Sequence, residues 1–233
     1  RNFYDKTSKL EGRGRLPGQD KFDIEAQETI RKVRDEISLL DAAGRQLIFT
    51  GARTFNGWLG EKVSNEQLRE IYDLMKMCPT SGNCCPIRIK FLTTDEAKQK
   101  LEPILNEPNR AKTMLAPVIA IFGNDHKFFE HNDFFAPHRP GVIRNRMEEN
   151  PDLVLPWANL NGTLQAAYFI LAVRAVGLDA GPMQGLNKAK ADEVFWSGTD
   201  IKTNFVCSIG RGDEDTVFKR LPRFEFNEVC EII

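Results

Sequence analysis

The sequence predicts a layered α+β or α/β domain with one central sheet. Segments in which apolar residues recur at helical spacing alternate along the chain with short apolar segments typical of buried strands. The helical segments outnumber the strand-like ones. With 233 residues, 41% of them apolar, the chain is long enough for one large domain, or for one domain with an added arm.

The chain begins with two segments that differ from the rest. Residues 1 to 22 are rich in glycine and charge and lack periodicity, so we expect an extended arm. From Ile24 to Leu40 apolar residues recur at helical spacing within a strongly charged segment, which predicts a helix with a narrow apolar stripe. Such a stripe favours packing against a surface or a second subunit. A solvated leader that tolerates deletion is the alternative.

Further elements are predicted between residues 41 and 123. A second helix covers residues 41–50, and a third covers residues 65–77 after the capping box Ser64-Asn65-Glu66-Gln67. Residues 87–94 alternate as a strand. They are followed by a short helix to about Leu105 with Asp95 as its N-cap, and by a fully buried strand over residues 117–123.

Residues 124–155 are different in kind. They contain all three histidines, four phenylalanines and several arginines, and their periodicity is weak. A long irregular segment in a compact protein is often a lid or a binding loop, and an ordinary surface excursion is an equal alternative.

The longest predicted helix runs from Pro156 to Leu178 and ends at Gly177. It is apolar on nearly all faces, which places it at the centre of the molecule or of a dimer. The remaining predicted elements are a helix over residues 188–196 capped by Asn187, a buried strand over residues 203–210, and a tail from Lys219 with an apolar end.

Composition argues against several classes of function. The formal net charge is −1 and the basic residues are scattered, so we expect no nucleic-acid partner. The longest apolar run, Ala166 to Val173, is too short for a membrane span. Five cysteines without a CxxC pair favour free thiols and a cytoplasmic location, although an organellar protein that has lost a presequence would fit equally well. The histidines lack the spacing of a metal site, and we expect none.

Three segments carry residues suited to ligand chemistry. Arg53-Thr54-x-Asn56 offers a guanidinium fork, a hydroxyl and an amide to a phosphate, and Arg220 and Arg223 are further candidates for the same phosphate. The loop from Pro79 to Pro86 suits the rim of a planar polar ligand, with a plain helix-to-strand connection as an equal alternative. Residues 181–185 are bracketed by glycines, which permits close approach of the backbone to a flat ring.

The sequence lacks the usual signatures of catalysis by side chains. GxSxG, GxGxxG and Walker motifs are absent, and so are paired carboxylates at motif positions. The sequence offers residues for binding a phosphate and the edge of a ring, but no recognisable general acid or base. This combination indicates a cofactor that supplies the chemistry itself.

The order of these segments resembles the nitroreductase family of FMN-dependent oxidoreductases, and most closely its malonic semialdehyde reductase (RutE-like) branch. The matching motifs are Ala52-Arg53-Thr54-Phe55-Asn56-Gly57-Trp58, Met75-Lys76 with Pro79-Thr80-Ser81-Gly82-Asn83-Cys84-Cys85-Pro86, Ala116-Pro117-Val118, Asn161-Gly162-Thr163-Leu164-Gln165-Ala166-Ala167-Tyr168, Gly177-Leu178-Asp179-Ala180-Gly181-Pro182-Met183 and Leu221-Pro222-Arg223. The resemblance covers residues 40–233 and leaves residues 1–39 outside the family domain.

The resemblance implies a three-layer α-β-α fold, classed as α+β, with a mostly antiparallel central sheet. It also implies an intertwined homodimer with FMN at the interface. The residues implied to bind FMN are Arg53, Thr54, Asn56, Arg220 and Arg223 at the phosphate, Pro79, Thr80, Ser81 and Asn83 from the other subunit, and Pro182, Met183, Gln184 and Gly185 along the ring edge. This chain departs from many relatives at Asn56, where they have a second basic residue, and at Gln184, where they have an acidic one.

The resemblance further implies ping-pong turnover, in which NAD(P)H reduces FMN and a small acceptor then reoxidises it, with no catalytic side chain of the protein's own. For malonic semialdehyde, which would give 3-hydroxypropionate, the substrate carboxylate needs a cation. The candidates are Arg88, Arg139, Arg144 and Arg146. The alternatives are a broad nitroaromatic or quinone reductase, a flavin-binding protein without turnover, and a structural dimerisation module.

Overall fold

The computed structural model describes residues 21–37 and 39–233, and the side chains from residue 25 onward. The predicted arm over residues 1–22 lies almost wholly outside the described residues. The chain divides into two compact units, residues 1–45 and residues 46–233. The domain boundary expected after residue 39 stays a prediction.

The first unit contains the predicted charged helix. Helix α2 spans Lys21–Glu36, and the short helix α3 spans Ala42–Arg45. From residue 25 onward the apolar side chains of α2 are exposed, including Ile30 at 52% and Val33 at 46%. The predicted helix is therefore present, and the partner expected for its apolar stripe stays a prediction.

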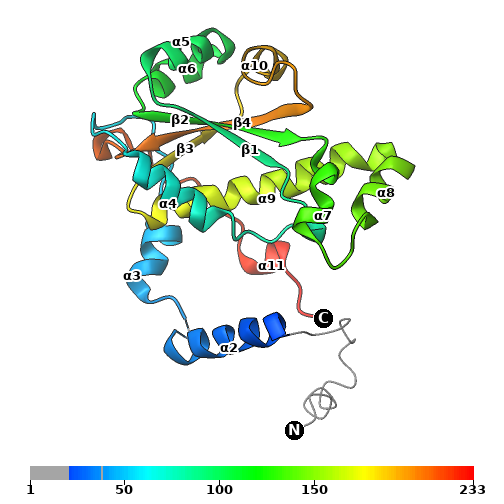
Figure 1. Cartoon of the computed structure of the whole chain (residues 1–233). Helices are drawn as coiled ribbons and strands as arrows, with labels where there is room; N and C mark the ends of the chain where they lie inside the picture. Colours follow the sequence, from blue (N-terminus) through cyan, green and yellow to red (C-terminus); the bar gives the residue numbers. More distant parts are fainter. Residues whose placement is uncertain (1–20, 38) are drawn as a thin grey trace. The chain divides into compact units, whose positions relative to one another are not determined.

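The second unit is built on a four-stranded sheet (Figure 1). Its strands are β1 (Ile87–Leu92), β2 (Val118–Asp125), β3 (Asp179–Met183) and β4 (Ile201–Gly210). The order is β1-β2-β4-β3 and every pair is antiparallel, with Ala120 of β2 opposite Phe91 on one side and Cys207 on the other. All eight residues of β2 are buried, as the sequence predicted.

Strand β3 is the element that the sequence analysis did not recognise as a strand. It contains Gly181 and Pro182, two residues that weaken a strand pattern. The proline is tolerated because β3 lies at the edge of the sheet, where one side of its backbone needs no ladder partner.

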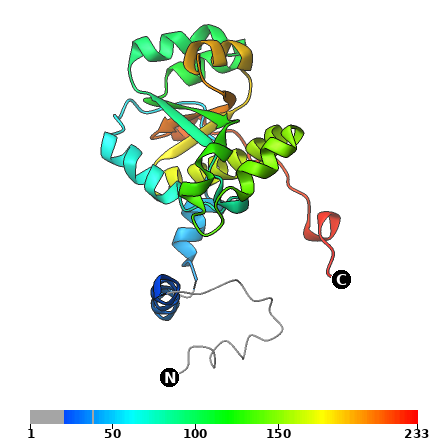
Figure 2. The same cartoon turned by 45° about the vertical axis from the view of Figure 1, so that its right-hand side comes forward.

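Helices cover both faces of the sheet (Figures 1 and 2). On one face, α4 (Asn65–Met75) and α9 (Val154–Ala175) bury residues such as Ile71 and Phe169 against Phe122 of β2. On the other lie α5 (Asp95–Leu101), α6 (Glu107–Met114) and α10 (Lys188–Phe195), with Leu101 and Phe195 packed around Ile121. The α+β prediction of three layers with an antiparallel sheet is confirmed.

Side-chain caps define the start of three helices, α4, α5 and α10. Ser64 forms the predicted capping box of α4 with Gln67, and Asn187 caps α10 as predicted. The prediction of Asp95 as the cap of α5 is wrong, because the Thr94 side chain accepts the hydrogen bond from the Ala97 N–H. Two neighbouring residues could both cap, and the hydroxyl one position earlier does so.

Several predicted helices have different bounds. The charged helix predicted from Ile24 to Leu40 spans Lys21–Glu36, and the helices predicted over residues 65–77 and 188–196 end at Met75 and Phe195. Helix α5 stops at Leu101, and the 3₁₀ turn η4 (Glu102–Ile104) follows because Pro103 cannot continue the α-helix. Within the predicted helix over residues 41–50, residues 46–50 form the π-helical turn η2 (Gln46–Thr50). Helix α9 begins at Val154, two residues earlier than predicted.

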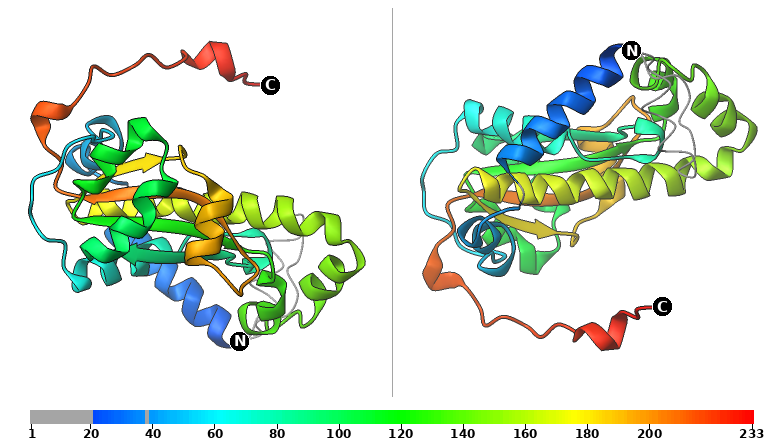
Figure 3. Two further views of the ribbon diagram at one scale, coloured as in Figure 1. Left: turned by 90° about the horizontal axis from the view of Figure 1, so that it is seen from above. Right: turned by 90° about the horizontal axis from the view of Figure 1, so that it is seen from below.

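The segment expected to be irregular, residues 124–155, contains short helices instead. They are η5 (Phe128–His131), α7 (Asn132–Phe135), α8 (Val142–Glu149) and η6 (Pro151–Leu153), and they gather at the start of α9 (Figure 3). Phe128 and Met147 are buried there against Cys84 and Ala158. Helices this short show no clear period in a sequence, which is why the prediction missed them.

The C-terminal segment leaves the body of this unit (Figures 2 and 3). The turn η7 (Glu214–Thr216) is followed by a tail in which every residue from 218 to 233 is exposed, including the short helix α11 (Phe226–Val229). Within the described residues, no helix is long and apolar enough to cross a membrane, and no cluster of His, Cys, Asp or Glu side chains is placed to hold a metal ion.

Candidate functional site

Two of the predicted phosphate-binding arginines lie close together although 167 positions separate them in the chain. The Arg53 guanidinium donates to the Phe218 carbonyl oxygen. Arg220 donates to the carbonyl oxygens of Thr50 at 2.9 Å and Ala52 at 3.0 Å. The segments 50–53 and 218–220 are therefore fastened to each other by guanidinium–carbonyl bonds.

Arg223 is not part of this arrangement. Its guanidinium donates to the Leu221 and Pro222 carbonyl oxygens at 3.2 and 2.9 Å, and the side chain is exposed. The tail has already left the body of the unit at this position. A phosphate contact from Arg223 therefore stays a prediction, as does one from Asn56.

A third arginine, which the sequence analysis did not single out, lies against the same stretch of chain. Arg174 in the last turn of α9 donates to the Ile48 carbonyl oxygen at 3.1 Å, and its Nε is buried without a partner. Burial lowers the pKa of Arg174, and the charge of Arg220 acts in the same direction. The sequence contained a signal, because Arg174 is the one charged residue of α9.

The chemistry of these donors fits a phosphate. In the described part of the chain, none of the three guanidiniums of Arg53, Arg174 and Arg220 pairs with a carboxylate. Each donates to backbone carbonyl oxygens, which a phosphate oxygen can replace with a stronger charge-assisted bond. The buried, unpartnered Nε of Arg174 is a further donor in this cluster.

The predicted ring-edge segment lies beside this cluster. Thr54 forms a parallel β-bridge with Ala180, so the strand β3 that continues to Pro182 and Met183 starts next to the Arg53 motif. The Asn109 side chain donates to the Gly185 carbonyl oxygen at 3.1 Å. A Cβ at position 185 would overlap the Asn109 side-chain amide, so glycine leaves room for this contact with α6.

Helix α6 therefore adds residues that the sequence analysis missed. Besides Asn109, the Thr113 hydroxyl donates to the Asn109 carbonyl oxygen at 2.6 Å and lies 2.9 Å from the Met183 sulfur. The Asn106 N–H donates to the Gly185 carbonyl oxygen at 2.9 Å. Asn106 and Asn109 sit at the start of a short helix, where asparagine is commonly a cap, so their position alone gave no functional signal.

The loop from Pro79 to Pro86 connects α4 with β1 and has an unusual backbone. It contains the 3₁₀ turn η3 (Ser81–Asn83), and Gly82, Asn83 and Cys85 have φ angles of 61°, 54° and 41°. Ser81 and Asn83 are exposed. In the described part of the chain, no hydrogen bond or β-bridge links this loop to the arginine cluster or to the ring-edge segment.

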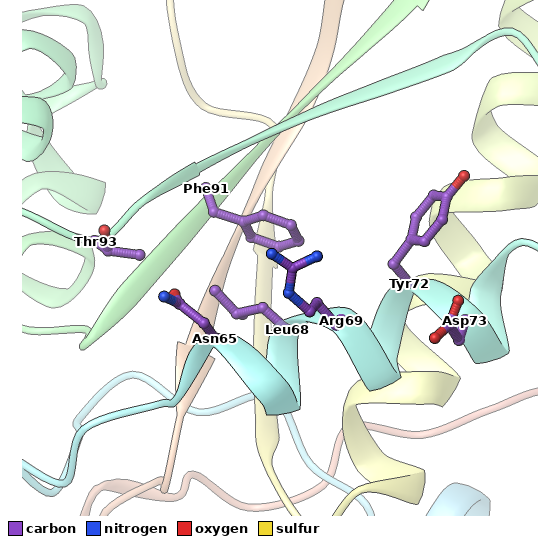
Figure 4. A pocket seen from close by; sticks show the side chains of 7 residues that line it. All are labelled: Asn65, Leu68, Arg69, Tyr72, Asp73, Phe91 and Thr93. Atoms are coloured by element: carbon purple, nitrogen blue, oxygen red, sulfur yellow. The ribbon is translucent and has the colours of Figure 1, made fainter.

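A groove in the described surface lies elsewhere. It has a volume of about 630 Å³ and runs between α4 and the edge strand β1 (Figure 4). It is lined by Asn65, Leu68, Arg69, Tyr72, Asp73, Phe91 and Thr93. None of the predicted site residues belongs to this lining, so we do not assign the predicted chemistry to it.

The four arginines predicted as partners of a substrate carboxylate differ in their surroundings. Arg88 pairs with Asp125 at 2.6 Å and Arg144 with Asp133 at 3.2 Å, so both charges are compensated. Arg146 lies 5.0 Å from the centre of the Trp157 ring. Arg139 is exposed and forms no ion pair with the described residues. The uncompensated candidates are thus Arg139 and Arg146.

The second unit is thus a three-layer α+β domain with an arginine cluster suited to a phosphate beside its edge strand β3. The family model described as "Nitroreductase family" matches residues 53–211. The chain belongs to the nitroreductase family.

Its relatives agree with this assignment. The chain is 47% identical over 186 residues, 79% of its length and 95% of the relative's, to a Cupriavidus pinatubonensis protein named "Putative NADH dehydrogenase/NAD(P)H nitroreductase". A Leptothrix cholodnii protein of the same name is 44% identical over 194 residues, covering 83% and 98% of the two chains. A crystal structure of a "putative nitroreductase" from Exiguobacterium sibiricum, in complex with FMN, has a TM-score of 0.70 at 19% identity and covers 84% of this chain and 98% of that one.

Proposed function

We propose that this protein is an FMN-dependent NAD(P)H oxidoreductase that reduces a small carbonyl compound, with malonic semialdehyde as the substrate. The observation that carries the cofactor assignment is the cluster of Arg53, Arg174 and Arg220, whose charges have no carboxylate partner among the described residues. A dianionic phosphate is the ligand that such a cluster favours. The names of the relatives supply the nicotinamide donor.

FMN, when bound, would supply hydride transfer from NAD(P)H to the acceptor. Arg53 and Arg220 would hold its phosphate, with Thr54 as an additional donor. Pro182, Met183, Gln184 and Gly185 would lie along the ring, and the contacts from α6 to Met183 and Gly185 would keep that segment in place. The protein's contribution is to bind and orient the reactants and to exclude water.

A homodimer completes this arrangement. The loop residues Pro79, Thr80, Ser81 and Asn83 are not connected to the arginine cluster within one chain, which is expected if they serve the FMN of a second copy. Helix α9 has exposed apolar side chains, including Leu160 at 60% and Leu164 at 43%. The tail is also apolar and exposed, with Phe224 at 74%. Apolar surface of this extent favours burial against another copy.

Within this proposal, Arg139 or Arg146 would bind the substrate carboxylate, because their charges are uncompensated. A broad nitroaromatic or quinone reductase is the second candidate function, and the names of the relatives at 47% and 44% identity favour it. A reducing, cytoplasmic compartment stays a prediction from the five free cysteines.

An absorption spectrum of the purified protein supplied with FMN tests the proposal. Flavin bands that bleach on anaerobic addition of NADPH or NADH, and recover on addition of malonic semialdehyde, are the expected result. Bands that never bleach would leave a flavin-binding protein, and no bound flavin would overturn the proposal. Steady-state rates with the aldehyde and with a nitroaromatic, measured side by side, separate the two candidate functions.

Arg220→Gln tests the phosphate assignment directly. Loss of a charge-assisted hydrogen bond predicts FMN binding weaker by about tenfold or more. The matched control is Arg69→Gln, because Arg69 is an arginine of the groove in Figure 4 that contacts none of the proposed FMN residues. Equal FMN affinity of the two variants would refute a phosphate role for Arg220.

A further inference from the structure

Two buried amides on α9 hold the ends of the loop segment from Ser81 to Ile87. Asn161 is fully buried and Gln165 is 3% exposed. The Ser81 N–H donates to Asn161 Oδ1 at 2.7 Å, and the Ile87 N–H donates to Gln165 Oε1 at 3.0 Å. Because the two amides are four residues apart, they lie one turn apart on the same face of the helix.

Neither backbone N–H has an alternative partner in its own segment. Ser81 is the first residue of η3, and Thr80 before it forms no side-chain capping bond, so the free N–H at the start of this turn is satisfied from α9. Asn161 is itself fixed, because its Nδ2 donates to the Trp157 carbonyl oxygen at 2.8 Å. The acceptor therefore has one defined orientation.

Between the two anchors, the backbone is strained. Asn83 and Cys85 have positive φ angles of 54° and 41°, a region that costs free energy for residues with a side chain. A bond from the Cys85 N–H to Thr80 Oγ1 at 3.3 Å and one from Asn83 Nδ2 to the Phe135 carbonyl oxygen at 2.9 Å add to the constraint. The loop nevertheless exposes Ser81 and Asn83.

The close approach of α9 to the sheet depends on Gly162, between the two amides in the chain. A Cβ there would come within 2.7 Å of Asn124 Cγ on β2, and closer still to its Oδ1. The same helix thus combines a glycine that allows contact with the sheet and two amides that reach the loop.

We propose that Asn161 and Gln165 are positioning residues of the flavin site, which hold residues 81–87 in a strained conformation so that Ser81 and Asn83 are presented to FMN in a preorganised geometry. This inference rests on the proposed function. A strained backbone costs free energy, and this loop is strained where Ser81 and Asn83 are exposed. A ligand that binds the strained form of the loop explains why two buried amides maintain it. Without the amides the loop relaxes, and FMN binding must then reorder it.

The test uses Asn161→Leu and Gln165→Met, which keep the approximate volume and remove the acceptor oxygen. Asn161→Asp and Gln165→Glu keep an acceptor oxygen for the same N–H. Phe169→Leu is the matched structural control, because Phe169 is fully buried on the same helix and packs on Phe91 and Phe122 rather than on the loop. FMN affinity, the flavin midpoint potential and hydrogen exchange of the FMN-free protein are measured for each.

We expect Asn161→Leu and Gln165→Met to bind FMN at least about tenfold more weakly and to exchange the amides of residues 81–87 faster before FMN is added. The variants that keep the oxygen recover part of this loss. Phe169→Leu lowers the melting temperature but leaves FMN affinity and loop exchange unchanged.

Three outcomes overturn the inference. The first is unchanged loop exchange in Asn161→Leu and Gln165→Met. The second is unchanged FMN affinity despite faster exchange. The third is that Phe169→Leu loses as much FMN affinity as Asn161→Leu and Gln165→Met when the three variants are destabilised to the same extent. If the unaltered protein does not bind FMN, the proposed function is wrong. If the unaltered protein binds FMN and Asn161→Leu and Gln165→Met bind it equally well, only the positioning role is wrong.

Discussion

Replacing Gly162 by alanine tests the packing that brings α9 to the sheet. The new methyl group would meet the Asn124 side chain, which is 1% exposed and donates from Nδ2 to Asn159 Oδ1 at 2.9 Å. Asn124 cannot move into open space, so the variant must either break this bond or shift α9 away from β2.

The expected magnitude follows from three contributions. Overpacking of a buried site costs about 1–3 kcal/mol, and loss of the bond between Asn124 and Asn159 costs about 1 kcal/mol. Alanine is about 1 kcal/mol better than glycine inside a helix. The net prediction is a decrease of about 1–3 kcal/mol in the free energy of unfolding.

Urea denaturation followed by circular dichroism, at fixed protein concentration, measures this change. Gly60→Ala is the control, because a Cβ at residue 60 meets nothing within 4 Å. The decisive comparison is Gly162→Ala in an Asn124→Ala background. There the obstacle is gone, and the substitution becomes neutral or stabilising by up to about 1 kcal/mol. An equal loss of stability in both backgrounds would refute the assignment of the clash to Asn124.

Three further predictions concern other parts of the chain. Ser64→Ala removes the capping box of α4 and should lower the free energy of unfolding by about 1 kcal/mol in urea; an unchanged midpoint would contradict the cap. Burial lowers the pKa of His126 below its ordinary value of 6.5, so the unfolded chain binds more protons, and stability should fall as the pH drops below about 6.5. His126→Phe should show a weaker pH dependence in the same range, and equal slopes for both proteins would exclude His126 as the cause. Burial raises the pKa of Cys84 to about 11 and that of Cys207 to about 12, so a disulfide reagent at pH 8 should modify neither before unfolding; modification of either in the folded protein, assigned by mass spectrometry, would contradict their burial.

Local signals in the sequence were sufficient for the regular elements. The apolar run around Ile121 predicted a fully buried strand, and the capping residues Ser64 and Asn187 predicted the start of their helices. These features depend on residues a few positions apart, where spacing and side-chain chemistry act directly on the backbone. Strand β3 was missed because its glycine and proline are compatible with a strand only at a sheet edge, and edge position is a property of the whole sheet.

For the candidate site, too, the sequence predicted some features and the tertiary structure decided others. By itself, the sequence determined the residue types: an arginine motif at Arg53, a polar loop at Thr80, and a glycine-bracketed segment at Gly185, in an order that identified the family. The tertiary structure alone decided which of them meet. It placed Arg220 against Thr50, added Arg174, and left Arg223 in the exposed tail. The physical reason is that these contacts join residues more than 120 positions apart, and only the folded chain, with α9 packed on the sheet, fixes such distances.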